Sequence, residues 1–159
     1  LYEEFWKIYT GSEIIPPQYI SAEAKITKSI IGDGTEVYGE VQNSVIGAGV
    51  TIGKGSVIKD SIIMKGTTIG EGVVMDRAII AENVKIDNNV VLGVGEEVPN
   101  KVKPNVYSFG LVTIGEGSYI PPNVKIGKNT AISGTTVPED YPDGLLESGE
   151  TLKKDGEEA

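Results

Sequence analysis

The sequence predicts an all-β fold in which a single chain winds into a parallel β-helix of stacked, three-sided coils, with a short helical segment at its N-terminus. Ten times an aliphatic residue is followed three positions later by Gly or Asn, beginning with Ile31 and Gly34 and ending with Ile126 and Asn129. The aliphatic residues themselves recur every five or six positions. Gly and Asn tolerate left-handed backbone angles, so this spacing predicts a short strand followed by a corner, repeated along the chain.

A second kind of corner sets the length of one coil. Four related tetrapeptides begin at positions 28, 43, 60 and 77, which gives spacings of 15, 17 and 17 residues: Lys28–Ile31, Asn43–Ile46, Asp60–Ile63 and Arg77–Ile80. We expect these corners to be tight turns that require no left-handed residue. With coils stacked about 4.8 Å apart, each aliphatic side chain then packs on its counterparts in the coils above and below.

The repeat divides the chain into three regions. We expect residues 1–19 to form an N-terminal linker, residues 20–136 the β-helix with a loop at about 94–113, and residues 137–159 an acidic tail. The first nine residues, Leu1–Tyr9, hold four of the ten aromatic residues and predict a short, largely apolar helix. This helix either caps the first coil or docks onto a further domain, and the two roles are compatible.

The composition excludes several kinds of chemistry. The 159 residues include no His and no Cys, which excludes a histidine general base, a zinc site built on His or Cys, a thiol nucleophile and disulfides. Scattered acids such as Asp33, Glu71 and Asp87 occupy turn positions, where solvated side chains are expected. The sequence therefore predicts no catalytic residue and no metal ligand in this chain.

The charge distribution restricts the partners. Of the net charge of −9, most lies in positions 139–159, which hold eight acidic residues and two lysines. Without a basic stripe, the chain is not expected to bind nucleic acid. No apolar run approaches the roughly 20 residues of a membrane helix, so we expect no membrane partner and a cytoplasmic location.

Several segments carry a more specific resemblance. They are Phe5-Trp-Lys-Ile-Tyr-Thr, Pro16-Pro-Gln-Tyr-Ile, Val37-Tyr-Gly-Glu-Val-Gln-Asn-Ser-Val-Ile, Gly49-Val-Thr-Ile-Gly-Lys-Gly-Ser-Val-Ile and Arg77-Ala-Ile-Ile-Ala-Glu-Asn-Val-Lys-Ile. Together they resemble the C-terminal left-handed β-helix domain of bacterial glucose-1-phosphate adenylyltransferase (ADP-glucose pyrophosphorylase). The left-handed sense of the coil is implied by this resemblance alone. The resemblance further implies a preceding nucleotidyltransferase domain that joins ATP and glucose 1-phosphate in glycogen biosynthesis with the help of magnesium, and for which residues 1–19 are the linker.

The same resemblance implies what this domain does and where. Its partners would be its own catalytic domain and further subunits, in a homotetramer or in a hetero-oligomer with a paralogous subunit, and it would share an allosteric site for a phosphorylated metabolite. Arg77, the only arginine, matches a basic effector position of enteric members, and Lys101 and Lys103 in the loop are weaker candidates. Plant members carry effector lysines where this chain has Glu82 and Glu116, so an effector of the plant type is not expected.

Alternatives stay open. Arg77 would equally serve as a rung of a polar ladder, pairing with Asp60 one coil away, at about 0.2 to 1 kcal/mol. The domain would also suit a non-catalytic regulatory paralogue, or another sugar-nucleotide pyrophosphorylase, although the Phe5-Trp-Lys-Ile-Tyr motif disfavours the latter. A structural solenoid with no enzyme attached is the remaining case.

Overall fold

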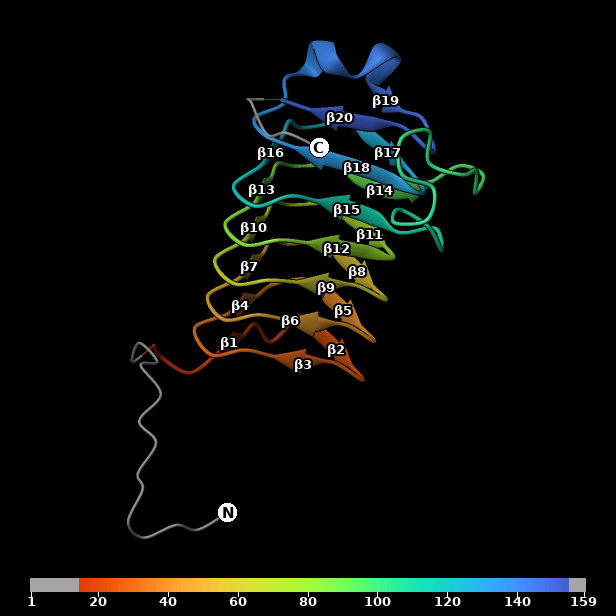
Figure 1. Cartoon of the computed structure of the whole chain (residues 1–159). Helices are drawn as coiled ribbons and strands as arrows, with labels where there is room; N and C mark the ends of the chain where they lie inside the picture. The colour runs from red at the N-terminus through yellow and green to blue at the C-terminus, as the bar shows by residue number, and fades with distance from the viewer. Residues whose placement is uncertain (1–14, 155–159) are drawn as a thin grey trace, which may run out of the picture.

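The computed structural model describes residues 15–154, which form a three-sided prism of stacked coils (Figure 1). Each side is one parallel sheet, and each regular coil contributes one short strand to each sheet. Sheet A contains β1 (Tyr19–Ile20), β4 (Glu36–Val37), β7 (Thr51–Ile52), β10 (Thr68–Ile69), β13 (Lys85–Ile86) and β16 (Tyr119–Ile120). Sheet B contains β2 (Lys25–Thr27), β5 (Glu40–Gln42), β8 (Val57–Lys59), β11 (Val74–Asp76), β14 (Val91–Val94), β17 (Lys125–Gly127) and β19 (Leu145–Leu146). Sheet C contains β3 (Ile30–Ile31), β6 (Val45–Ile46), β9 (Ile62–Ile63), β12 (Ala78–Ile80), β15 (Val112–Ile114), β18 (Thr130–Ser133) and β20 (Thr151–Lys153).

The core is a set of aliphatic columns that run along the prism axis. In sheet A, Ile52 pairs with Ile69 and Ile69 with Ile86, and each of these side chains is at most 1% exposed. Sheets B and C carry equivalent columns, so the predicted stacking of like on like is confirmed. Fully burying one such side chain contributes about 1.5 to 3 kcal/mol, and every added coil repeats that gain.

The first kind of corner is as predicted. All ten Gly and Asn positions have positive φ, between 55° and 70°. The expectation for the second kind, between sheets B and C, is wrong. Lys28, Asn43, Asp60 and Arg77 also adopt the left-handed conformation, with φ between 48° and 53°. Left-handed angles cost a residue with a Cβ roughly 1 to 2 kcal/mol, so something in the fold must offset this cost.

A ladder of serine hydroxyls stabilises these corners. The hydroxyl of Ser44 donates to Gln42 O (2.7 Å) and accepts from Ser61 N (3.1 Å), and the hydroxyl of Ser61 donates to Lys59 O (2.6 Å) and accepts from Ala78 N (3.0 Å). Each hydroxyl thus satisfies a buried backbone group in its own coil and another in the next. The ladder ends at Ala78, where a loop interrupts the repeat above.

The C-terminal region continues the prism past the expected end at residue 136. Two 3-10 turns, η1 (Pro138–Asp140) and η2 (Pro142–Gly144), lead into β19 and β20, which pair with β17 and β18. Tyr141, between the two turns, is 2% exposed and packs on the core. The acidic tail is therefore largely a further coil, because strand pairing needs only a few aliphatic residues in register.

The interrupting loop spans residues 95–111 between β14 and β15, close to the expected range of 94–113. The helix expected at Leu1–Tyr9 lies outside the described residues. Residues 15–154 contain no helix of the length and apolar character needed to cross a membrane.

Candidate functional site

Arg77 lies directly below the loop, at the corner between sheets B and C. The backbone oxygen of Arg77 accepts from Val112 N (2.9 Å), the first residue of the strand that follows the loop. In the lower corners the equivalent backbone N–H donates to a serine hydroxyl of the coil below. Because Val112 N donates to Arg77 O instead, position 78 needs no hydroxyl and Ala suffices there. The corner therefore joins the Arg77 backbone to the point where the loop returns to the prism.

The Arg77 side chain reaches the last part of the loop. A Cβ placed on Gly110 would lie 3.6 Å from Nη1 of Arg77 and 3.4 Å from Oε2 of Glu97, so both charged groups converge on this glycine. Gly110 is buried and has a φ of 72°, which favours glycine independently of the space. Arg77 itself is exposed, with its guanidinium beside the loop.

The predicted ladder pair between Arg77 and Asp60 is wrong. Within residues 15–154 no carboxylate lies within 4.0 Å of the Arg77 guanidinium. Asp60 instead accepts a hydrogen bond from the side-chain amide of Asn43, one coil below, at 2.5 Å. The Arg77 side chain lies against the loop, which the regular repeat does not contain. Asp60 is therefore hydrogen-bonded to Asn43 and not to Arg77.

Two asparagines hold the loop against the upper coils. Asn129, 4% exposed, donates from its side chain to Val98 O (2.7 Å) and accepts from Gly110 N (2.8 Å), so it ties the first and last parts of the loop together. Asn129 is itself a corner residue with left-handed φ. The backbone of Asn129 thus turns the coil, and its side chain joins the first and last parts of the loop.

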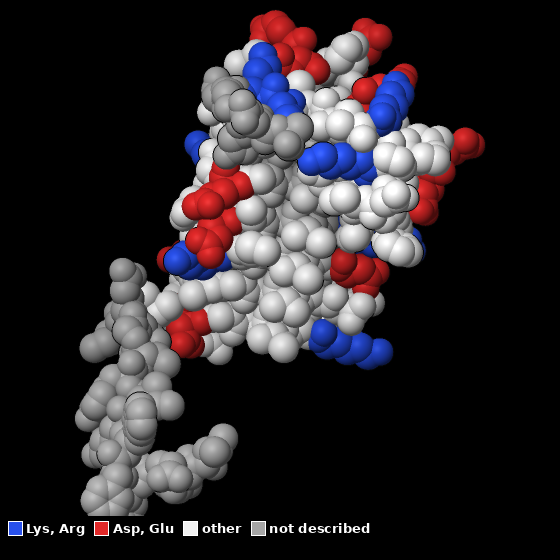
Figure 2. All heavy atoms as spheres, viewed as in Figure 1, with Lys and Arg blue, Asp and Glu red and all other residues white. Residues whose placement is uncertain are grey.

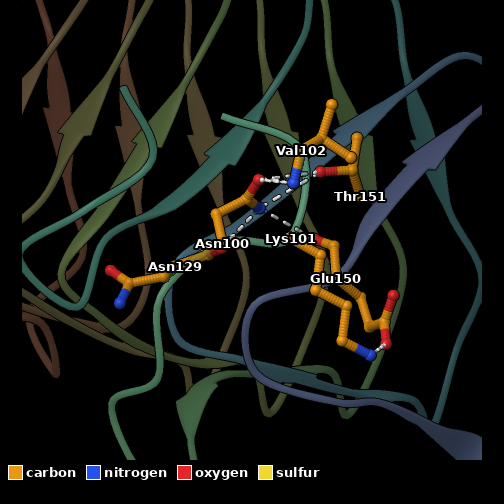
Figure 3. A network of polar contacts seen from close by, with 6 residues as sticks. All are labelled: Asn100, Lys101, Val102, Asn129, Glu150 and Thr151. Atoms are coloured by element: carbon orange, nitrogen blue, oxygen red, sulfur yellow. Dashed lines mark hydrogen bonds and ion pairs between the residues drawn. The ribbon is translucent and has the colours of Figure 1, made fainter. Parts of the chain in front are cut away.

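Asn100 holds the middle of the loop (Figure 3). It is 2% exposed, and its Nδ2 donates to Asn129 O (2.9 Å) and to the hydroxyl of Thr151 (3.1 Å). Its Oδ1 accepts from Val102 N (2.9 Å) and Lys103 N (2.8 Å). Every polar atom of this buried amide is therefore satisfied, and it connects the loop to the corner before β18 and to β20.

The two loop lysines are placed by this network. Lys101 forms an ion pair with Glu150, and the hydrogen bond from Lys101 to that carboxylate raises the pKa of the lysine above its ordinary value. The Lys101 backbone N–H donates to Gly149 O (2.9 Å). Lys103 is exposed, and only its backbone takes part in the network. No contact within the described residues brings either lysine to Arg77, whose side chain meets the loop at Gly110.

A hollow beside the C-terminal coil has the wrong charge for an anionic ligand. This hollow of about 590 Å³ beside η2 and β19 is lined by Asp140, Asp143, Glu147 and Glu150, with Lys125 as its one basic group. The lining repels phosphate rather than attracting it. In the range 15–154 no three His, Cys, Asp or Glu side chains gather in a group able to hold a metal ion.

Sequence reasoning missed the roles of Asn100 and Asn129. Asn129 carried a signal as the left-handed residue of its corner, but nothing in the period shows that its side chain fixes a loop. Asn100 lies in the aperiodic segment and had no signal, since its partners on the prism are 29 and 51 residues away.

A three-sided parallel β-helix with Gly or Asn at its corners defines the class of hexapeptide-repeat proteins. The family model described as "GlmU-like, C-terminal hexapeptide" matches residues 16–114, and the chain belongs to this family.

Several curated relatives share one name. A glucose-1-phosphate adenylyltransferase of Lachnospira eligens is 66% identical over 157 residues, which cover 99% of this chain and 37% of the relative. A protein of the same name from Thermotoga neapolitana is 58% identical over 150 residues, covering 94% of this chain and 36% of the relative. The chain thus spans little more than a third of the length of these relatives and corresponds to their C-terminal part. Among solved structures, the acetyltransferase domain of PglB from Neisseria gonorrhoeae matches 83% of this chain and 55% of its own, at 20% identity and a TM-score of 0.35.

Proposed function

We propose that this chain is the C-terminal β-helix domain of a glucose-1-phosphate adenylyltransferase, and that a catalytic domain elsewhere in the protein forms ADP-glucose and pyrophosphate from ATP and glucose 1-phosphate. The observation that carries the proposal is 66% identity over 99% of the chain to a relative of that name. Magnesium would be held by the catalytic domain. The role of this domain is then assembly and regulation, with the oligomer a homotetramer or a hetero-oligomer with a paralogous subunit.

The regulatory part of the proposal rests on the corner below the loop. Arg77 is exposed, and its planar guanidinium suits bidentate binding of a phosphate. Lys103 is a second exposed cation on the same loop, whereas Lys101 is held by Glu150 and would contribute only after that pair opens. A phosphorylated metabolite bound at Arg77 would contact the Gly110 end of the loop and so act on its docking.

The test uses the full-length protein. Pyrophosphate release is measured with glucose 1-phosphate and ATP, UTP or GTP in turn, and then with Arg77→Ala while fructose 1,6-bisphosphate is titrated. ATP-selective turnover is expected, with an activation curve that Arg77→Ala shifts to higher concentration. Lys54→Ala, which removes an exposed cation at a different corner between β7 and β8, serves as the control and should leave the curve in place.

Other results identify the alternatives. Turnover that prefers UTP or GTP would mean another sugar-nucleotide pyrophosphorylase. The absence of turnover with every nucleotide would mean a regulatory paralogue, and stimulation of an active partner subunit would then be the activity to measure. Activation indifferent to Arg77→Ala would remove that residue from the effector site.

A further inference from the structure

The aliphatic columns of the core end uncovered at the last coil. In sheet B, Leu92 and Ile126 are at most 1% exposed, whereas Leu146, next in register, is 7% exposed. In sheet C, Ile132 is 2% exposed, whereas its partner Leu152 in β20 is only half-buried. β19 and β20 are the last strands of sheets B and C, and within the described part of the chain no strand pairs with their outer edges. Unpaired strand edges beside uncovered apolar side chains form a template to which a further strand can add.

Two hollows lie along β19 and adjoin one another. One, of about 590 Å³, lies between η2, β19 and β20, and the other, of about 520 Å³, lies between β19 and the start of the loop. Both are lined by Lys125, Leu145 and Glu147, so they form one groove, which we call the C-terminal groove. Its apolar lining consists of Val94, Val98, Pro142, Leu145, Leu146 and Leu152. A groove of this volume accommodates a peptide segment.

The groove has an acidic rim. Figure 2 shows acidic side chains at the upper end of the prism, where β19 and β20 lie in Figure 1. Two of the rim carboxylates are already paired, Asp140 with Lys154 (2.6 Å) and Glu150 with Lys101. Lys125 is the one basic group among the described residues that line the groove. The remaining carboxylates are exposed and form no ion pair within the described residues: Glu96, Asp143 and Glu147. The unpaired charge of the rim is therefore predominantly negative.

Two of the unpaired carboxylates bracket β19. Asp143 precedes Leu145 by two positions, and Glu147 follows Leu146 directly. Four residue steps of about 3.3 Å span up to about 13 Å, so the two acidic residues are at most that far apart along the strand. A segment that lies along β19 therefore meets leucine side chains at its centre and a carboxylate at each end.

The walls of the groove are fixed by contacts within the fold. The Ser148 hydroxyl accepts from Lys128 N (3.0 Å), and Gly149 N donates to Lys128 O (2.8 Å), which holds the corner after β19 in place. On the other side of the groove, the ion pair between Lys154 and Asp140 joins the residue after β20 to η1. Because the groove is preformed, little conformational entropy is lost on the prism when a segment binds.

Charge complementarity selects the occupant. The residues that follow Lys154 include the acids Asp155, Glu157 and Glu158, so the rim repels this part of the chain. A second copy that approached with the same end would bring two acidic rims together, and like charges oppose each other across an interface. A segment with both aliphatic and basic side chains instead suits the lining and the rim together.

We propose that the C-terminal groove binds an extended segment of a partner protein, which adds to sheet B as a parallel strand on the outer edge of β19. The segment has aliphatic residues between two Lys or Arg residues four positions apart. Its aliphatic side chains cover Leu146 and Leu152, and its basic side chains pair with Asp143 and Glu147. Its backbone pairs with the free edge of β19. The inference is independent of the adenylyltransferase assignment.

A peptide titration tests the binding. The 159-residue chain, which has its own core, is titrated into a fluorescein-labelled peptide of sequence Ser-Lys-Val-Leu-Val-Lys-Ser, and fluorescence anisotropy is followed. For a contact this small we expect a Kd on the order of 100 μM, which weakens several-fold when salt is raised from about 0.05 to about 0.5 M. The same peptide N-methylated at the amides between its lysines keeps its charges but cannot pair with a strand edge, so its affinity should fall about tenfold or more. Equal affinity of the two peptides would overturn the proposal.

A matched pair of variants tests the rim. Asp143→Asn with Glu147→Gln removes the two charges, and Asn tolerates the left-handed backbone of position 143, where φ is 52°. Because each exposed ion pair is weak, the two changes together should weaken binding about 2-fold to 30-fold. Asp33→Asn with Glu71→Gln removes two exposed carboxylates from corners of other coils and should leave the Kd unchanged. Equal effects of the two double variants would mean that binding responds to net charge alone, and the groove would lose its role.

Hydrogen exchange of the unaltered chain locates the contact without any variant. The peptide should slow the exchange of the amides of β19 and leave β1, β2 and β3, the strands of the first coil, unchanged. Equal protection at both ends of the prism would mean unspecific strand addition and would contradict the proposal. Sedimentation of the chain as a dimer that the peptide dissociates would also contradict it, because the groove would then belong to a second copy.

Discussion

Replacing Asn100 with Ala tests whether this side chain fastens the loop to the prism. The substitution removes donors to Asn129 O and Thr151 Oγ1 and the acceptor of Val102 N and Lys103 N. Each hydrogen bond contributes about 0.5 to 1.5 kcal/mol net, and buried partners left alone cost more than those that water reaches. With two partners on the prism and two on the exposed loop, we expect a loss of about 2 to 4 kcal/mol.

The loss should be local. Coils of a solenoid interact chiefly with their neighbours, so the destabilisation is expected in residues 95–111 and 145–153 rather than in the first coils. Native-state hydrogen exchange measures it directly. A loss of 2 to 4 kcal/mol corresponds to exchange roughly 30-fold to several-hundred-fold faster in those segments, with no change around β4 to β9.

Asn105→Ala is the matched control. Asn105 is an exposed asparagine of the same loop, and its replacement should change stability by less than about 0.5 kcal/mol. If Asn100→Ala accelerated exchange no more than Asn105→Ala, the loop would be held by its backbone contacts and the role assigned to Asn100 would be refuted.

Three further outcomes are expected. Ser61→Ala leaves a buried amide of the next coil without its acceptor and should cost about 1 to 3 kcal/mol in urea unfolding; an unchanged midpoint would contradict the serine ladder. Gly53→Ala would overlap a backbone oxygen of the next coil and should prevent stable folding, whereas Gly55→Asn, with no atom within 4 Å of the new Cβ, should retain it; the two melting temperatures decide. Burial raises the pKa of Tyr141 to about 12, so the neutral phenol stabilises the fold below pH 10 and this contribution is lost between pH 10 and 12; Tyr141→Phe should show a shallower fall over that range, and equal falls would refute it.

The two kinds of corner show how far local sequence reasoning extends. Gly34, Asn89 and their equivalents were predicted because these residue types tolerate positive φ. The corners at Asp60 and Arg77 have the same backbone conformation, but the prediction for them was wrong, because Asp and Arg are not residue types that indicate positive φ. Their conformation is stabilised by serine hydroxyls, which donate within their own coil, as Ser61 does to Lys59 O, and accept from the next coil, as Ser61 does from Ala78 N. The second of these is a contact between coils and not a property of the corner residue.

The candidate site divides in the same way. Arg77, Lys101 and Lys103 were proposed as effector-binding residues from the sequence and its resemblance to a family, and that role stays a prediction. Their surroundings were not predicted correctly: the pairing of Arg77 with Asp60 was expected and is absent within the described residues, while Lys101 is paired with Glu150. These contacts depend on where an aperiodic loop lies, and the repeat carries no information about that.

The sequence by itself determined the stacked coils, their three sides and their aliphatic columns, because each of these follows from a spacing of a few residues and from the backbone angles that each residue type tolerates. The tertiary structure decided how the loop docks, how the C-terminal residues join the prism and which charges meet. These contacts join residues far apart in the chain, as Asn100 and Thr151 are, 51 positions from one another. They depend on the stacked coils, since the stack is what brings such distant groups within hydrogen-bonding distance.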